Sequence, residues 1–218
     1  MAFTIKRSGL LATILFWLKR AHNLFWEIYL NVNTLTHLTR AYTNGLYGDA
    51  NGYAGSAYYV LLMIFKRLSI TKDSQFVDYG CGKGRAVCFA ARLPFRKVVG
   101  VEVNHELACI ARINANKMRK RKASIEIIEN DVLNYDCKDG TIFFMYNSFG
   151  TKTLGAVLEK IHQSLRQNPR TIQIIYYNPV HSELFRKCEW LEKNNALSFK
   201  TLAMDEARVP CVEFYQNK

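Results

Sequence analysis

Hydrophobic residues follow two spacings along the chain. From residue 8 to residue 34 they recur at the spacing of one long amphipathic helix. After residue 57, short apolar runs alternate with segments of helical spacing. The apolar runs are QFVDY (75–79), KVVGVE (97–102), SIEIIE (124–129), TIFFMY (141–146) and TIQIIYY (171–177). The helical segments lie at about 57–68, 84–93, 104–118, 153–166 and 181–188. Apolar runs with little alternation are typical of strands that are covered on both faces.

Alternation of this kind predicts an α/β fold: a Rossmann-like, doubly wound sheet that is mostly parallel. The C-terminal part departs from it, because ALSFKTLAM (196–204) and PCVEFY (210–215) flank a charged turn and predict an antiparallel hairpin. The glycine-rich segment 42–56 predicts a loop. We therefore divide the chain into an N-terminal helix and loop, residues 1–52, and one globular domain, residues 53–218.

The net charge is strongly positive. Lys and Arg total 30 against 18 Asp and Glu, which gives a formal charge of +12. Such a charge favours an anionic partner, either nucleic acid, an anionic membrane surface or an acidic protein, although an inert basic surface is the simpler alternative. The run KMRKRK (117–122) concentrates this charge after an expected helix, where it is either a solvated helix end or a contact with nucleic acid or anionic lipid.

The cysteines and the N-terminal helix indicate the cellular compartment in which the protein works. The six cysteines form no CxxC pair and no cluster with His, so neither a metal site nor a disulfide framework is indicated. The apolar stretch from Gly9 to Leu18 is too short to span a bilayer. The helix therefore either packs on the domain or lies in a membrane interface, with Trp17 and Trp26 near the headgroups. We predict a cytoplasmic protein, peripheral at a membrane in the second case.

The segment FVDYGCGKGRAV (76–87) contains the clearest candidate site. Gly80, Gly82 and Gly84 follow the first strand of the expected sheet, where ligands of such sheets bind, and they allow close approach of the main chain. The spacing does not fit a phosphate loop, and a dinucleotide fingerprint would need glycine where Arg85 stands. The carboxylate of Asp78 would repel a pyrophosphate and suits a cationic amino group.

The pattern D-x-G-x-G-x-G resembles the first motif of the class I, seven-β-strand methyltransferases that use S-adenosylmethionine (SAM), and the resemblance extends over roughly residues 53–215. It implies that the glycine turn lies beneath SAM and that Asp78 holds its amino group. It also implies that Glu102 accepts hydrogen bonds from the ribose, with Val103 against the adenine. Asp131 matches the acceptor of the adenine amino group, with Val132 behind it.

The strand end FFMYNSFG (143–150) concerns the methyl acceptor. Methyltransferases that modify amino groups of nucleic acids carry two prolines where this chain has Ser148 and Phe149. The segment is more similar to the non-SET lysine methyltransferases of the disruptor-of-telomeric-silencing type and their prokaryotic and mitochondrial relatives, which carry Asn followed shortly by Phe. Their loop over SAM reads Tyr-x-x-Ser/Thr, which Tyr53 and Ser56 match.

This second resemblance implies a methyltransferase that acts on a protein lysine without a metal. It implies catalytic roles for Tyr146, Asn147 and Phe149, with Tyr176 and Tyr177 as further walls of an aromatic channel. Two alternatives stay open: a methyltransferase of RNA, DNA or a small molecule, and a SAM-binding or membrane-associated protein without catalysis.

Overall fold

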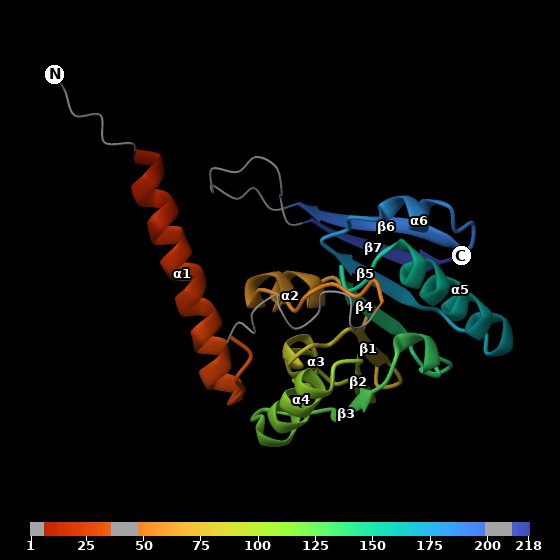
Figure 1. Ribbon diagram of the computed structural model, residues 1–218, viewed down its shortest axis with the longest axis horizontal. Coiled ribbons are helices and arrows are strands. Elements are labelled where there is room, and N and C mark those ends of the chain that lie inside the picture. The colour runs from red at the N-terminus through yellow and green to blue at the C-terminus, as the bar shows by residue number, and fades with distance from the viewer. Residues whose placement is uncertain (1–6, 36–47, 199–210) are drawn as a thin grey trace.

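The fold is built around one sheet of seven strands, seen in a computed structural model that describes residues 7–35, 48–198 and 211–218 (Figure 1). The strand order is β3-β2-β1-β4-β5-β7-β6. The strands are β1 (Gln75–Tyr79), β2 (Lys97–Glu102), β3 (Ser124–Glu129), β4 (Ile142–Tyr146), β5 (Gln173–Tyr177), β6 (Leu191–Ser198) and β7 (Cys211–Asn217). Strands β1 to β5 are parallel, and β7 runs antiparallel to both β5 and β6. The predicted mostly parallel sheet with an antiparallel C-terminal hairpin is confirmed.

Helices cover both faces of this sheet. They are α1 (Arg7–Leu30), α2 (Tyr58–Phe65), α3 (Arg85–Ala90), α4 (His105–Lys117), α5 (Thr151–Gln167) and α6 (Ser182–Arg186), with a short 3-10 helix, η2 (Val132–Asn134). Neighbouring strand residues enter two separate cores. Phe76 and Phe144 pack with α2 and α3, whereas Val77 and Phe143 pack with α5 and α6. Both central strands are therefore buried on both faces, as their apolar sequences predict.

The order of the strands reverses at β1, which lies between β2 and β4. The helix that follows β1 and the helix that follows β4 cover opposite faces of the sheet. Such a reversal leaves a crevice beyond the carboxyl ends of the two strands. The glycine turn after Tyr79 begins at this point.

Two strands differ most from their predictions, while β4, β5 and β7 differ by one or two residues at their ends. Strand β6 begins at Leu191 and not at residue 196, because its polar first half, EKNN, is exposed and shows no apolar pattern. Strand β3 is not covered on both faces: it is an edge strand paired only with β2, and half of its side chains reach solvent. The charged turn DEAR lies outside the described residues.

The N-terminal helix is shorter than predicted and is only partly separate. It ends at Leu30 because Asn31 adopts a left-handed conformation (φ 56°), and the amide of Val32 bonds back to the carbonyl of Glu27 at 3.0 Å. Its last turns pack against the domain, and Leu30 belongs to the core. The preceding turns extend away from the domain (Figure 1). The boundary after residue 52 stays a prediction.

Candidate active site

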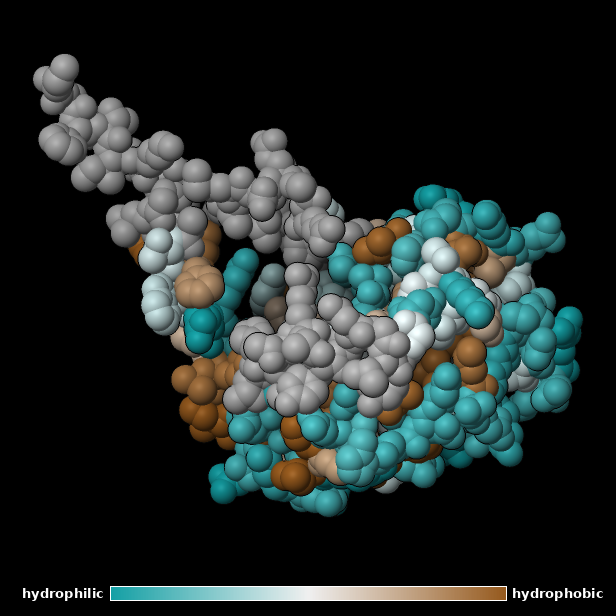
Figure 2. Space-filling view, viewed as in Figure 1, coloured by the Kyte–Doolittle hydropathy of each residue, from teal (hydrophilic) through white to brown (hydrophobic). Residues whose placement is uncertain are grey.

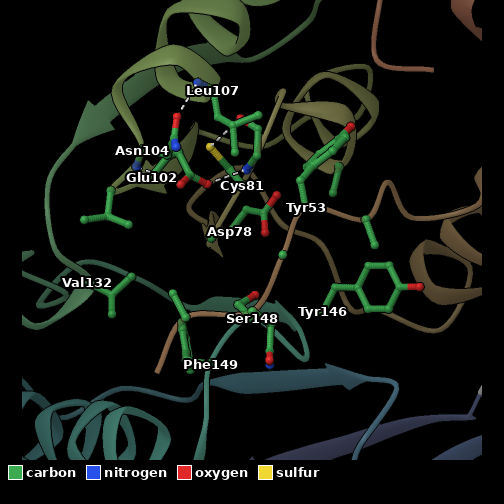
Figure 3. Close-up of a pocket in the computed structure, with 18 of the residues that line it drawn as sticks. Tyr53, Asp78, Cys81, Glu102, Asn104, Leu107, Val132, Tyr146, Ser148 and Phe149 are labelled. Carbon is green, nitrogen blue, oxygen red and sulfur yellow. Dashed lines mark hydrogen bonds between the residues drawn. The ribbon is translucent and has the colours of Figure 1, made fainter. Parts of the chain in front are cut away.

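A cavity of about 340 Å³ opens beyond the carboxyl ends of β1, β2 and β4 (Figure 3). It brings together most of the residues that the sequence singled out. They are Tyr53, Ser56, Asp78, Gly80, Gly82, Glu102, Val103, Asp131, Val132, Tyr146 and Phe149. Gly84 and Asn147 do not line it. Among the described residues, no group of three or more His, Cys, Asp or Glu is placed to hold a metal ion.

The glycine turn forms the floor of the cavity. Gly80 and Gly82 have φ values of 76° and 55°, which side-chain-bearing residues rarely adopt. A Cβ atom on Gly80 would lie 2.8 Å from the Cβ of Ser148, and one on Gly82 would collide with the ring of Tyr53. The turn is thus closed on both sides by other chain segments. Gly84 serves packing instead, because a Cβ there would lie 3.3 Å from the Cβ of Ala111 on α4.

Asp78 places a carboxylate in the middle of the cavity (Figure 3). The residue is 3% exposed, and no hydrogen bond or ion pair reaches its carboxylate from the other described residues. Burial, with a further contribution from the negative charge of Glu102, raises the pKa of Asp78 well above its ordinary value. A buried carboxylate in this setting is a strong acceptor for a cationic ligand group.

Glu102 shapes the floor as well as facing the ligand space. Its two carboxylate oxygens accept hydrogen bonds from the backbone amides of Gly82, at 2.8 Å, and Asn104, at 3.0 Å. Burial raises the pKa of Glu102, while these amides act in the opposite direction. Each oxygen retains a second lone pair, so the same carboxylate can also accept from ligand hydroxyls.

We expect Glu102→Gln to destabilise the protein by about 1–3 kcal/mol, because the amide nitrogen of Gln cannot accept from one of the two buried N–H groups. Urea unfolding of the ligand-free protein measures the effect. Glu106→Gln on the exposed first turn of α4 is the matched control and should leave the midpoint unchanged. Equal midpoints for both variants would show that Glu102 does not support the turn.

Asp131 adds a third carboxylate, after β3. It is exposed, and its side chain accepts a hydrogen bond from the amide of Leu133 at 2.8 Å, which caps η2. Val132, which begins η2, presents its apolar side chain to the same side of the cavity (Figure 3). The cavity therefore has carboxylates contributed from the ends of three neighbouring strands.

The end of the cavity next to β4 is aromatic, with one further carboxylate, Asp49, held by Thr153. Tyr146 stacks on Tyr177 with ring centroids 4.1 Å apart, and Phe149 is buried in the core on the other face of the sheet. The hydroxyl of Ser148 donates to the carbonyl of Tyr79 at 2.7 Å. Tyr176 lies on the other face of β5, where it packs against Phe185, so it forms no wall here.

Asn147 turns its side chain away from the cavity. Its backbone is left-handed (φ 43°), and its side-chain oxygen accepts from the hydroxyl of Tyr176 at 3.4 Å. Its carbonyl accepts from the side chain of Asn51 at 2.7 Å. In this arrangement Asn147 holds the end of β4 against Tyr176 and Asn51. Its predicted catalytic role stays a prediction.

One wall of the cavity could not be predicted from the hydrophobic pattern of the sequence. Residues 48–52 belong to the segment predicted as a linking loop, yet they pack along the end of β4. The amide of Asn51 donates to the carbonyl of Ser148 at 2.9 Å, and Asp49 accepts from the hydroxyl of Thr153 at 2.5 Å. Asn104, by contrast, could have been found as an N-cap, since its side chain accepts from the amide of Leu107.

A buried ionic network ties α1 to the cavity. It consists of Glu27, Thr34, Tyr53, Tyr58 and Arg85, and we call it the Glu27 network. The Nε atom of Arg85 lies 3.6 Å from a Glu27 oxygen, and that oxygen also accepts from the hydroxyl of Tyr58 at 2.7 Å. The amide of Thr34 donates to the other Glu27 oxygen at 2.5 Å.

The Glu27 network also fastens the loop that covers the glycine turn. Arg85 donates to the carbonyls of Thr34, at 2.9 Å, and Ser56, at 3.1 Å. The hydroxyl of Tyr53 donates to the carbonyl of Thr34 at 3.0 Å, and burial raises the pKa of Tyr53 to about 12, so this donor keeps its proton at neutral pH. In the sequence, Arg85 was notable only because it stands where a dinucleotide motif has glycine. In the structure, its hydrogen bonds hold residues 53–56 in place.

Solved structures of similar fold are numerous. One is an RNA methyltransferase from Salinibacter ruber in complex with S-adenosyl-L-homocysteine, with 16% identity, 75% of this chain and 94% of that chain covered and a TM-score of 0.54. Another is precorrin 8W decarboxylase from Methanobacterium thermoautotrophicum, with 20% identity, 76% and 93% covered and a TM-score of 0.56. A TehB-like SAM-dependent methyltransferase from Corynebacterium glutamicum has 16% identity, 72% and 86% covered and a TM-score of 0.52. At these identities the likeness shows the fold alone.

The family match is more specific than the structural likeness. No curated protein matches the chain significantly. The family model for the histone methylation protein DOT1 matches residues 26–209, which is most of the chain and includes every lining residue of the cavity. The chain therefore belongs to the DOT1 family and is a class I SAM-dependent methyltransferase.

Proposed function

We propose that this methyltransferase transfers the methyl group of SAM to the side-chain amine of a protein lysine. The observation that carries the proposal is the division of the cavity into a floor with three carboxylates and an end at β4 with aromatic walls. The family model adds support, since its description concerns methylation of a protein.

The residues present fit SAM. Asp78 is a buried acceptor without a partner among the described residues, which suits the amino group of the ligand. Glu102 has free lone pairs for the vicinal ribose hydroxyls, and Asp131 can accept from the adenine amino group. Gly80 and Gly82 line the cavity and allow the turn to pack directly against Ser148 and Tyr53, which forms the floor beneath the ligand space. When bound, SAM supplies an already activated methyl group.

The aromatic end suits an amine that must first lose its proton. A lysine side chain has an ordinary pKa of about 10.4, and apolar surroundings favour its neutral form. Tyr146 and Phe149 offer such surroundings and align the acceptor. Burial raises the pKa of Tyr146, so its hydroxyl remains protonated and does not serve as the base. The proton of the amine therefore goes to an acceptor other than Tyr146.

We expect Tyr146→Ala to lower the rate of methyl transfer roughly 30-fold, because the acceptor loses one aligning wall. Tyr146→Phe is the matched control: it keeps the stacking on Tyr177 and should retain nearly full activity. The measurement is transfer of labelled methyl from SAM to the protein and nucleic-acid fractions of a cell lysate, followed by mass spectrometry of labelled peptides.

The fraction of the lysate that carries the labelled methyl group identifies the class of acceptor. Label on lysine in the protein fraction, lost in Tyr146→Ala, supports the proposal. Label confined to nucleic acid or to small molecules would overturn the protein acceptor, while binding of SAM without transfer to any fraction would overturn catalysis. SAM binding by calorimetry is measured in parallel, so that loss of cofactor is distinguished from loss of acceptor alignment.

A further inference from the structure

The N-terminal helix exposes a continuous apolar stripe. The large apolar side chains at six positions along one side of α1 are between 47% and 69% exposed. They are Ile14, Trp17, Leu18, Leu24, Phe25 and Ile28. Their spacing of mostly three, four or seven residues puts them on one face of the helix, where Ala21 is also exposed. Figure 2 shows hydrophobic atoms gathered over the lower part of this helix.

The stripe is not required for the shared fold. Glu27 and Leu30 on the opposite side of α1 are buried in the domain, so the stripe faces away from it. The family model begins at residue 26, which leaves most of the stripe outside the matched region. An apolar surface of this kind, exposed on a helix, marks a contact with a partner or a membrane.

The charges around the stripe are all positive. Lys19 and Arg20 are exposed on α1, and the only acidic residue of this helix, Glu27, is buried in the Glu27 network. The ammonium of Lys19 lies 5.5 Å from the ring centroid of Tyr59, and the guanidinium of Arg20 lies 5.6 Å from that of Phe16. Arg20 also lies 5.9 Å from the ring centroid of Trp17 and therefore borders the stripe, whereas Lys19 lies on the side of α1 that faces the domain.

The basic run 117–122 lies at the end of the same helix. The amide of Arg119 donates to the carbonyl of Leu30 at 2.7 Å, and the side chain of Asn31 donates to the carbonyl of Lys117 at 2.9 Å. The ammonium of Lys120 is 5.8 Å from the ring centroid of Tyr29. The exposed cations of this run are Lys117, Arg119, Lys120, Arg121 and Lys122. Two segments far apart in the sequence thus lie together at the end of α1 (Figure 1). Their side chains make one surface, apolar along α1 and basic at its end.

We propose that this surface binds an anionic membrane, with the stripe of α1 in the interface and the basic run 117–122 against the lipid headgroups. A helix in this position buries its apolar face at the headgroup boundary, and each nearby cation adds to the attraction. Within the described residues, no helix is long and apolar enough to cross a membrane. The helix therefore lies along the surface.

The charges favour lipid over the other two candidates. A second copy of the chain would bring Lys19 and Arg20 against the same cations without an exposed acid on the described part of α1 to pair with them. Nucleic acid would pair with the basic run but would leave the apolar stripe in water. Anionic lipid satisfies both parts of the surface at once.

Flotation of the full chain with vesicles tests the proposal. We expect binding to vesicles of phosphatidylcholine with phosphatidylserine, much weaker binding to phosphatidylcholine alone, and weakening by salt. Lys120→Ala together with Arg121→Ala should lower the partition about 30-fold. Trp17→Gln together with Phe25→Gln should abolish binding, because the headgroup attraction of the remaining cations is no longer joined to burial of apolar surface.

The control is Val180→Gln, which removes an equally exposed apolar side chain elsewhere and should bind like the unchanged protein. All the replaced side chains are exposed, so thermal unfolding midpoints should stay equal and exclude misfolding. Three outcomes would overturn the proposal: equal partition of all variants, a dimer in light scattering that the Trp17 and Phe25 changes dissociate, or binding to duplex nucleic acid with none to vesicles.

Discussion

Arg85→Met is expected to lower the free energy of unfolding by about 3–5 kcal/mol, because it leaves the carboxylate of Glu27 buried without its cation. Met keeps much of the volume of the Arg side chain and isolates the loss of charge. The variant should also bind SAM more weakly, since the carbonyls of Thr34 and Ser56 lose the donor that fastens residues 53–56. Urea unfolding and calorimetry with SAM measure the two effects.

A double-mutant cycle separates the ion pair from packing. Glu27→Gln keeps an acceptor for Tyr58 but removes the charge. Combined with Arg85→Met, it should cost clearly less than the sum of the single changes, because neither partner is then left charged and alone. Additive costs would mean that the two side chains stabilise the fold independently, and the ionic interpretation of the Glu27 network would be wrong.

Asp78→Asn is expected to weaken SAM binding by at least ~100-fold, while it stabilises the ligand-free protein. The first effect follows from loss of a buried carboxylate partner for the cationic amino group. The second follows because Asp78 and Glu102 are two buried negative groups in one cavity, and their repulsion disappears. A variant that lost both affinity and stability would instead place Asp78 among the structural residues.

The same substitution should change the pH dependence of stability. The pKa of Asp78 is raised in the folded state, so between its ordinary value and its raised value the folded protein binds more protons than the unfolded one. The stability of the ligand-free protein therefore falls as pH rises through this window. Asp78→Asn should flatten that fall, whereas SAM affinity of the unchanged protein should rise over the same window as the carboxylate ionises.

The sheet and the floor of the cavity were predictable because both follow from short-range rules. Each of the first three strands was found at its correct bounds, and the carboxyl ends of parallel strands meet at one edge, which brings Asp78 and Glu102 together. Asn147 shows the limit of this reasoning. Its position beyond β4 was predictable, but its left-handed backbone, which directs the side chain toward Tyr176, was not.

Contacts between segments far apart in the chain could not be predicted from the sequence, for a different reason. Arg85 and Thr34 are 51 residues apart, and no local pattern relates a charge on α3 to the end of α1. The stripe of α1 posed the opposite difficulty. Its apolar spacing predicts a helix equally well whether the helix is buried or exposed, and only the structure shows which face the domain covers.

The edge position of β3 has a consequence for the behaviour of the protein in concentrated solution. A free strand edge can pair with another chain and start aggregation. Here Glu126 on β3 forms an ion pair with Lys97 at 2.5 Å, and Glu129 pairs with Arg112 at 2.8 Å. At the opposite edge, β6 exposes the polar residues 192–195. A strand that added to either edge would have to strip water from these groups, so both ends of the sheet oppose polymerisation without any covering element.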